Sequence, residues 1–134
     1  MSGRDELTAF ARLASSLAGL GLEPRPDEPL SRHTSFGIGG PAALFVVSRS
    51  TADLSAALGA ATAAGIEPLL LGSGTNLLVS DDGFPGLALR LELGGLAIDR
   101  AAGRIVAGAG VPAAELVEHS IAAGLAGLEF AAGL

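Results

Sequence analysis

The sequence predicts an α+β fold rather than a doubly wound parallel sheet. One helical pattern is followed by several consecutive short strands before the next long helix, whereas strictly alternating strands and helices would predict the doubly wound arrangement. Twenty glycines in 134 residues fall in clusters, which indicates tight turns or backbone that approaches a ligand closely. A chain of this length suffices for one domain with a substantial core.

The first element is an amphipathic helix predicted over residues 5–18. Its apolar face carries Leu7, Phe10, Ala14 and Leu17, and its first turn carries Asp5 and Glu6. Residues 21–30, GLEPRPDEPL, contain three prolines and alternating charge, which predicts an extended linker. We therefore expect residues 1–28 to form an N-terminal helix and Pro-rich linker beside the main domain, which begins at residue 29.

The next elements are a strand, a helix and a second strand. Ala42 to Val47 is a short apolar run bounded by turn-forming residues. Ser50-Thr51-Ala52-Asp53 fits a capping box for an alanine-rich helix over about residues 52–64, which Gly65 ends. Pro68 to Leu71 predicts the second strand.

Short strands and one helix fill the rest of the chain. The expected elements are strands at 76–80 and 87–92, a turn at 81–86 between them, a strand–turn–strand over 96–110, and a helix after Pro112. On this last helix Leu116, Val117, Ser120, Ile121 and Gly124 are expected to face inward, and Glu115, Glu118 and His119 outward.

Composition excludes several function classes. Eight basic and fourteen acidic residues give a formal charge of −6, which argues against nucleic acid or an anionic membrane as partner. The absence of cysteine excludes disulfides, thiolate metal sites and a cysteine nucleophile. No apolar run is long enough to span a membrane, and the charged N-terminus does not resemble a secretory signal. We expect a cytoplasmic protein.

Glycines cluster at residues 37–42, 72–76 and 108–110, and the first two clusters can be compared with known phosphate-binding patterns. Residues 37–42 match the dinucleotide pattern G-x-G-x-x-G/A, but a polar segment precedes them and a strand follows, so the strand and helix that the pattern needs are missing. Residues 72–76 follow one strand and precede another. Anion binding there would rest on successive backbone N–H groups in a concave turn. Glycine, serine and asparagine are also common in plain turns, so local sequence leaves both interpretations open, the turn being favoured.

The remaining polar candidates are isolated. His33 and His119 belong to no cluster at metal-ligand spacing and are expected to be ordinary surface or hydrogen-bonding histidines, so no metal site is predicted. Glu129 lies in an apolar stretch and is expected to have a backbone or helix-end partner. No Ser-His-Asp order or carboxylate pair stands out.

Four motifs in order resemble the UDP-N-acetylenolpyruvoylglucosamine reductase family, also called UDP-N-acetylmuramate dehydrogenases. They are Thr34 to Ala42 (TSFGIGGPA), Leu71 to Leu78 (LGSGTNLL), Gly108 to Gly110 (GAG) and Gly127 to Phe130 (GLEF). Each motif alone is weak, but their order and spacing make the combination specific. The resemblance covers residues 29–134.

This resemblance implies an FAD-binding domain of the vanillyl-alcohol-oxidase (PCMH) type, with non-covalent FAD held between two α+β subdomains. It implies that the loop after the strand at 68–71 lies against the FAD pyrophosphate and that a Gly-Gly turn, expected beyond residue 134, forms the other wall of the flavin site. The cofactor-binding residues implied are Leu71, Gly72, Ser73, Gly74, Thr75, Asn76, Leu77 and Gly133.

The reaction implied is reduction of UDP-N-acetylglucosamine enolpyruvate to UDP-N-acetylmuramate for peptidoglycan synthesis, and hence for cell shape and division, with NADPH as co-substrate. The family's catalytic serine, glutamate and arginine match no residue here, so none is assigned. We expect an N-terminal part of the enzyme, with the FAD domain incomplete at residue 134, and an isolated chain that is inactive and binds FAD poorly. The alternatives are a non-catalytic FAD- or nucleotide-binding module and another FAD-linked oxidase of the same fold.

Overall fold

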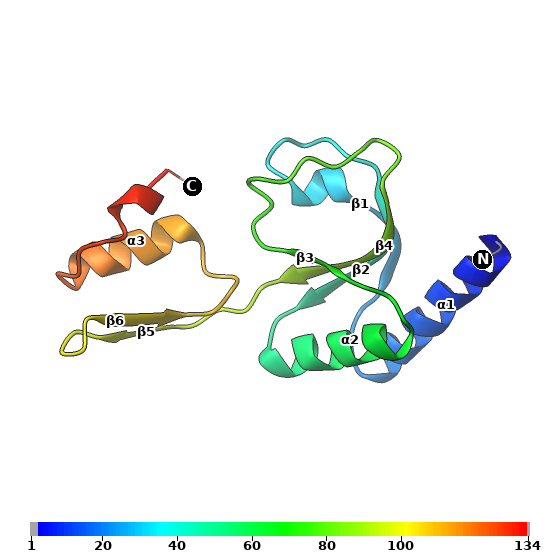
Figure 1. Ribbon diagram of the computed structural model, residues 1–134, viewed down its shortest axis with the longest axis horizontal. Helices are drawn as coiled ribbons and strands as arrows, with labels where there is room; N and C mark the ends of the chain where they lie inside the picture. Colours follow the sequence, from blue (N-terminus) through cyan, green and yellow to red (C-terminus); the bar gives the residue numbers. More distant parts are fainter. Residues whose placement is uncertain (1–2, 134) are drawn as a thin grey trace.

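The computed structural model describes residues 3–133 and contains two lobes (Figure 1). The larger lobe is a four-stranded sheet with the order β1-β2-β4-β3, and the smaller one is a two-stranded ribbon, β5-β6, with α3 packed beside it. The elements are α1 (Gly3–Gly19), β1 (Arg25–Pro29), η1 (Leu30–His33), β2 (Pro41–Ser48), α2 (Thr51–Ala63), β3 (Leu69–Leu71), β4 (Phe84–Leu91), β5 (Leu96–Asp99), β6 (Arg104–Ala107), α3 (Ala113–Ala122) and η2 (Glu129–Ala131).

The larger sheet is mixed. Strand β1 pairs antiparallel with β2, while β2 and β3 both run parallel to β4, which lies between them. Helix α2 makes the crossover from β2 to β3, as parallel strands require. The three parallel strands therefore end at one edge of the sheet, where the chain continues from β3 into residues 72–77.

The two faces of this sheet are covered differently. On one face, α1 and α2 pack on alternate residues of β2 and β4. The packing forms a hydrophobic cluster that includes Leu13, Leu17, Leu44, Val46, Ala57, Ala61, Leu87 and Leu89. On the other face, residues 3–133 place no long helix. There η1 and irregular backbone cover a second cluster built from Leu30, Ala42, Phe45, Leu71 and Ala88. The second face carries the glycine-rich loops.

The N-terminal segment differs from the sequence expectation. Helix α1 places Leu13 and Leu17 in the main core, at 2% and 0% exposure, so it is not an appendage. The stretch expected to be a linker includes β1, whose prolines are tolerated because an edge strand leaves part of its backbone unpaired. Leu7, expected on the apolar face, is 74% exposed. The boundary proposed at residue 29 remains a prediction.

The strand expected at residues 76–80 was wrong. These residues form no strand, and β4 begins at Phe84, inside the segment expected to be a turn. The backbone of this region pairs with another loop instead, because the Gly40 N–H donates to the Ser80 carbonyl at 2.8 Å. The short apolar run at residues 77–79 therefore did not identify a strand.

Most other elements are confirmed. Strand β2, helix α2, the β5-β6 ribbon and helix α3 lie where the sequence predicted them, and the capping box of Ser50 and Asp53 is formed. On α3, Val117 and Ser120 are buried as expected, but Ile121 is 63% exposed. Among residues 3–133, no helix is long and apolar enough to cross a membrane.

Candidate functional site

The loop that follows β3 surrounds a shallow cavity. Its volume is about 290 Å³, and it is lined by Leu70, Leu71, Gly72, Ser73, Gly74, Thr75, Asn76 and Leu77. The structure thus brings together seven of the eight residues assigned to the cofactor from the sequence. Gly133, the eighth, follows η2 in the smaller lobe and does not line this cavity.

Backbone donors are available along this loop. Within the described residues, the N–H groups of Ser73, Gly74, Thr75 and Asn76 donate no hydrogen bond. Gly74 has a left-handed φ of +71°, a conformation that helps successive N–H groups converge on one side of a turn. Ser73 Oγ and Thr75 Oγ1 lie 3.5 Å apart and add hydroxyl groups. Unpaired donors of this kind suit an anion without requiring a basic side chain.

Gly72 has space beside it that the fold does not use. A Cβ atom built on Gly72 would meet no atom within 4 Å, and its φ is not in the left-handed region. Neither strain nor crowding in the chain therefore requires glycine here. The open side of Gly72 would allow a ligand to approach the backbone closely.

Gly74 is required by the fold. A Cβ atom on Gly74 would overlap the carbonyl oxygen of His33, and the Ser35 N–H donates to the Gly74 carbonyl at 3.0 Å. Close backbone contacts continue at Gly39, where a Cβ would lie 2.7 Å from that of Val79, and at Gly40, which bonds to Ser80. We call residues 34–40 and 72–83 the paired loops. Gly39 and Gly40 therefore allow the two loops to pack closely, whereas a Cβ on Gly37 would meet no atom within 4 Å.

His33 lies behind the paired loops in a hydrogen-bonded cluster. Its side chain is 11% exposed and stacks on Phe45 with ring centroids 4.1 Å apart. Its Nε2 lies 2.9 Å from Glu28 Oε1, and its Nδ1 lies 3.1 Å from Arg90 Nη1. Because a guanidinium can only donate, Nδ1 accepts from Arg90 and Nε2–H donates to Glu28. The expectation of a hydrogen-bonding histidine is met, but its partners were missed.

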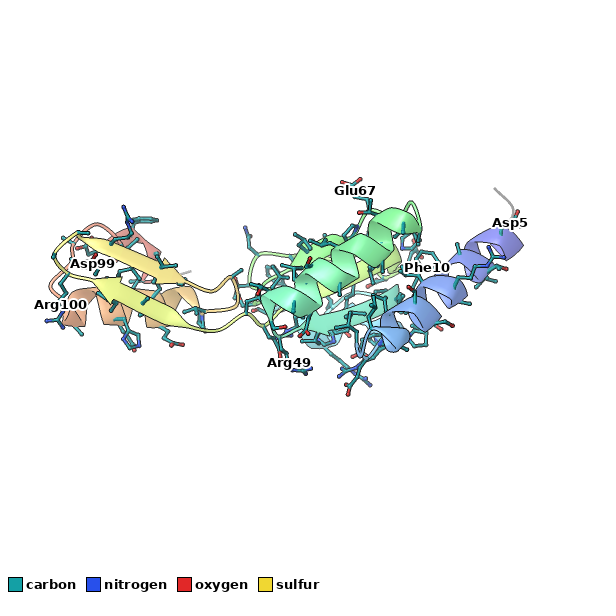
Figure 2. All side chains as sticks on the ribbon, turned by 90° about the horizontal axis from the view of Figure 1, so that it is seen from below. Asp5, Phe10, Arg49, Glu67, Asp99 and Arg100 are labelled. Carbon is teal, nitrogen blue, oxygen red and sulfur yellow. The ribbon has the colours of Figure 1, made fainter. Side chains whose placement is uncertain are left out.

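Arg90 extends this cluster to the carboxyl-terminal end of the parallel strands. Arg90 Nε lies 3.3 Å from Glu92 Oε1, and Arg49 Nε lies 3.4 Å from Glu92 Oε2. Arg49 follows the end of β2 and marks this edge in Figure 2. The charges alternate, so no uncompensated basic patch is formed here.

A larger cavity of about 610 Å³ lies elsewhere, between α1 and the start of β4. Phe10 and Glu67, labelled in Figure 2, lie on its walls, and Phe84 and Ile66 contribute further apolar surface. Its lining is mainly apolar and its charged residue is acidic, which does not suit an anion. None of the residues assigned from the sequence lines it.

The remaining candidates have local structural roles. Glu129 Oε2 accepts from the Gly127 N–H at 2.8 Å, and the backbone N–H groups of Glu129 and Gly127 lower the pKa of this exposed carboxyl. This is the backbone partner expected for Glu129. His119 is half exposed beside Glu115. In residues 3–133, no three histidine or acidic side chains gather as metal ligands would.

Residues 41–133 match the family model described as an FAD binding domain. The chain belongs to this FAD-binding family. The cavity loop after β3 and its unpaired N–H groups fall inside the matched region, together with the sheet edge at Arg90. The α+β, PCMH-type fold expected from the sequence is thereby confirmed.

The chain is also similar to several reductases. It is 48% identical over 110 residues to the UDP-N-acetylenolpyruvoylglucosamine reductase of Syntrophotalea carbinolica, an alignment covering 80% of this chain and 36% of that protein. It is 43% identical over 119 residues to the enzyme of that name from Solibacter usitatus, covering 88% and 38%. It is 40% identical over 130 residues to that of Geobacter metallireducens, covering 97% and 42%.

These relatives confirm the resemblance that the four motifs indicated. The chain spans about 36% to 42% of the length of the relatives described. The similarity therefore concerns the part of the enzyme that contains the FAD-binding match, and the activity of the whole enzyme is addressed below as a proposal.

Proposed function

We propose that the complete polypeptide carrying this chain is an FAD-dependent reductase that uses NADPH to convert UDP-N-acetylglucosamine enolpyruvate into UDP-N-acetylmuramate. The names of the relatives, the FAD-binding match over residues 41–133 and the order of the four motifs support this function. We also propose that the protein is cytoplasmic and that it binds neither nucleic acid nor membranes. The net charge of −6 supports the second point, because both partners favour a basic surface.

The observation that carries the proposal is the loop after β3. Its residues from Ser73 to Asn76 combine unpaired backbone N–H groups with a concave surface, and Gly72 leaves its side of the backbone open. These features fit a pyrophosphate, whose oxygens accept hydrogen bonds from a nest of N–H groups. We assign this loop to the FAD pyrophosphate, with Leu71 and Leu77 flanking it, and we keep Gly133 as a further cofactor-binding residue.

Bound FAD would supply hydride chemistry, taking a hydride from NADPH and delivering one to the enolpyruvyl double bond. The residues of this chain bind and orient the cofactor rather than transfer protons to the substrate. Both ring nitrogens of His33 are already hydrogen-bonded, and His119 lies in the smaller lobe. With no cysteine in the sequence, these contacts favour non-covalent FAD.

The test is to purify the complete polypeptide and record its visible absorption spectrum. A yellow protein that releases FAD on denaturation and oxidises NADPH only when UDP-N-acetylglucosamine enolpyruvate is added is the expected result. A colourless protein that does not take up FAD would contradict the proposal.

The same preparation separates the two alternatives. A flavoprotein that reacts with oxygen and another substrate, but not with the enolpyruvate, would indicate an FAD-linked oxidase of the same fold. Stable FAD binding without NADPH oxidation would indicate a non-catalytic module. Inactivation by Gly72→Ala, compared with an unaffected Gly59→Ala control, would connect the activity to the loop, because Gly59 lies on the exposed side of α2.

A further inference from the structure

We propose that His33 is a positioning residue for the FAD pyrophosphate loop, acting through its backbone rather than by touching the cofactor. The inference rests on the proposed function of that loop. It assigns to the Glu28–His33–Arg90 cluster a role that neither the motifs nor the family match indicates.

The imidazole of His33 is restrained on three sides. Glu28 accepts from one ring nitrogen at 2.9 Å, Arg90 donates to the other at 3.1 Å, and Phe45 stacks on the ring face. Glu28 belongs to β1, Phe45 to β2 and Arg90 to β4, so the ring is anchored to three neighbouring strands of the sheet. Such anchoring fixes the backbone at the end of η1.

That backbone is the surface on which Gly74 rests. The His33 carbonyl occupies the place that a Cβ of Gly74 would take, and Thr34 Cα lies 3.1 Å from the same point. The next residue, Ser35, donates its N–H to the Gly74 carbonyl at 3.0 Å. Any rotation of the His33 backbone would therefore move Gly74.

The Ser35 bond also sets the direction of a donor in the loop. The carbonyl of Gly74 and the N–H of Thr75 belong to one planar trans peptide, in which they point in opposite directions. Since the carbonyl points to Ser35, the Thr75 N–H points away from residues 34–40. His33 thus holds the peptide whose N–H is one of the unpaired donors assigned to the pyrophosphate.

Two variants of the complete polypeptide separate hydrogen bonding from packing. His33→Gln keeps an acceptor for Arg90 and a donor for Glu28 but loses the stacked ring. His33→Phe keeps the ring on Phe45 but loses both hydrogen bonds. Leu13→Ala serves as a stability control, because Leu13 is buried on the opposite face of the sheet and touches neither paired loop.

The measurement is the Kd of each apoprotein for FAD, from quenching of flavin fluorescence, beside its unfolding temperature. We expect His33→Phe to raise the Kd for FAD about tenfold, because this variant loses both charge-assisted hydrogen bonds of the ring. The Kd of His33→Gln should stay within about threefold of the wild-type value. Leu13→Ala should unfold at a lower temperature but bind FAD as wild type does.

Two results would overturn the inference about His33 while leaving the proposed function intact. In the first, His33→Phe binds FAD as tightly as wild type; in the second, Leu13→Ala loses as much affinity as His33→Phe, which would mean that stability alone explains the effect. If His33→Phe does not fold, Arg90→Met takes its place, because it removes the donor to His33 Nδ1. Wild-type affinity for FAD in that variant would overturn the inference, whereas a loss of about tenfold would support it. A wild-type protein that does not bind FAD would instead overturn the proposed function.

Discussion

Leu71, the last residue of β3, lies opposite Arg90 of β4 in the parallel register of the sheet. The glycine loop therefore begins one strand away from the guanidinium that holds His33. This arrangement gives the loop two supports, the sheet at Leu71 and the neighbouring loop at Gly74. The roles of the individual glycines can be separated by substitution.

Gly74→Ala should destabilise the protein by more than the strain of a left-handed alanine, which is about 1–2 kcal/mol. The added methyl group would meet the His33 carbonyl as well as adopting a φ of +71°. Chemical denaturation, monitored by circular dichroism, measures the free energy of unfolding. Gly65→Ala is a matched control, because its φ is +69° but its Cβ would meet nothing within 4 Å. Equal losses in the two variants would contradict the contact between the loops.

Gly72→Ala should behave in the opposite way. Because its Cβ would point into open space, the free energy of unfolding should stay within about 0.5 kcal/mol of wild type. If the FAD pyrophosphate approaches this backbone as proposed, the Kd for FAD should rise about tenfold. Fluorescence titration of the complete polypeptide measures this. Unchanged FAD affinity in a folded Gly72→Ala protein would place the pyrophosphate elsewhere.

Ser50→Ala should lower the free energy of unfolding by about 1 kcal/mol, because the Ser50 side chain accepts from the Asp53 N–H at the start of α2. Denaturant titration at neutral pH measures the change. Ser55→Ala, at an exposed position inside the same helix, is the control and should be neutral or slightly stabilising. If Ser55→Ala lowers the free energy of unfolding as much as Ser50→Ala does, the loss does not come from the Ser50 cap.

Asp53 should make stability depend on acid pH. Hydrogen bonds from the Arg49 N–H, and then from the Ser50 side chain and N–H, lower the pKa of Asp53 below its ordinary value of 3.8. A depressed carboxyl pKa stabilises the folded state above the unfolded pKa, and that stability is lost as the pH falls through the folded pKa.

Asp53→Asn should therefore be less stable than wild type at about pH 6, and the difference should shrink as the pH falls below about 3.8. Thermal unfolding of both proteins across this range measures the difference. A constant difference between wild type and Asp53→Asn at every pH would show that the charge of Asp53 does not contribute.

Leu89→Ala should cost about 2–5 kcal/mol, since Leu89 is fully buried in β4 beneath α1 and α2. Leu20→Ala, at a position that is 54% exposed, should change the free energy of unfolding by less than about 0.5 kcal/mol. Both values come from denaturant titration. A small loss for Leu89→Ala would place β4 outside the core.

Local sequence predicted the elements whose stabilising contacts are local or whose apolar pattern is complete. Strand β2 is an apolar run between turn residues, and the letters of the capping box at Ser50 and Asp53 identify the start of α2. The loop at 72–76 could be proposed because its glycines follow a strand, and the four motifs supplied the link to FAD.

Elements defined by distant partners could not be predicted in this way. The prolines of β1 indicate a linker until β2 is known to pair with it, and residues 76–80 resemble a strand although Ser80 bonds to Gly40 instead. His33 appeared isolated because Arg90 is far away in the sequence and reaches it only through the order of the strands. These outcomes depend on tertiary pairing, which overrides local preference.

The central position of β4 has a consequence for synthesis of the protein on the ribosome. Strands β2 and β3 are neighbours only through β4, although β4 comes after both in the chain. A nascent chain that ends before residue 84 therefore exposes two parallel strands without the strand that joins them, a form prone to misassembly. The loop assigned to the flavin acquires its support only when β4 has emerged, so the cofactor meets a completed sheet rather than a growing chain.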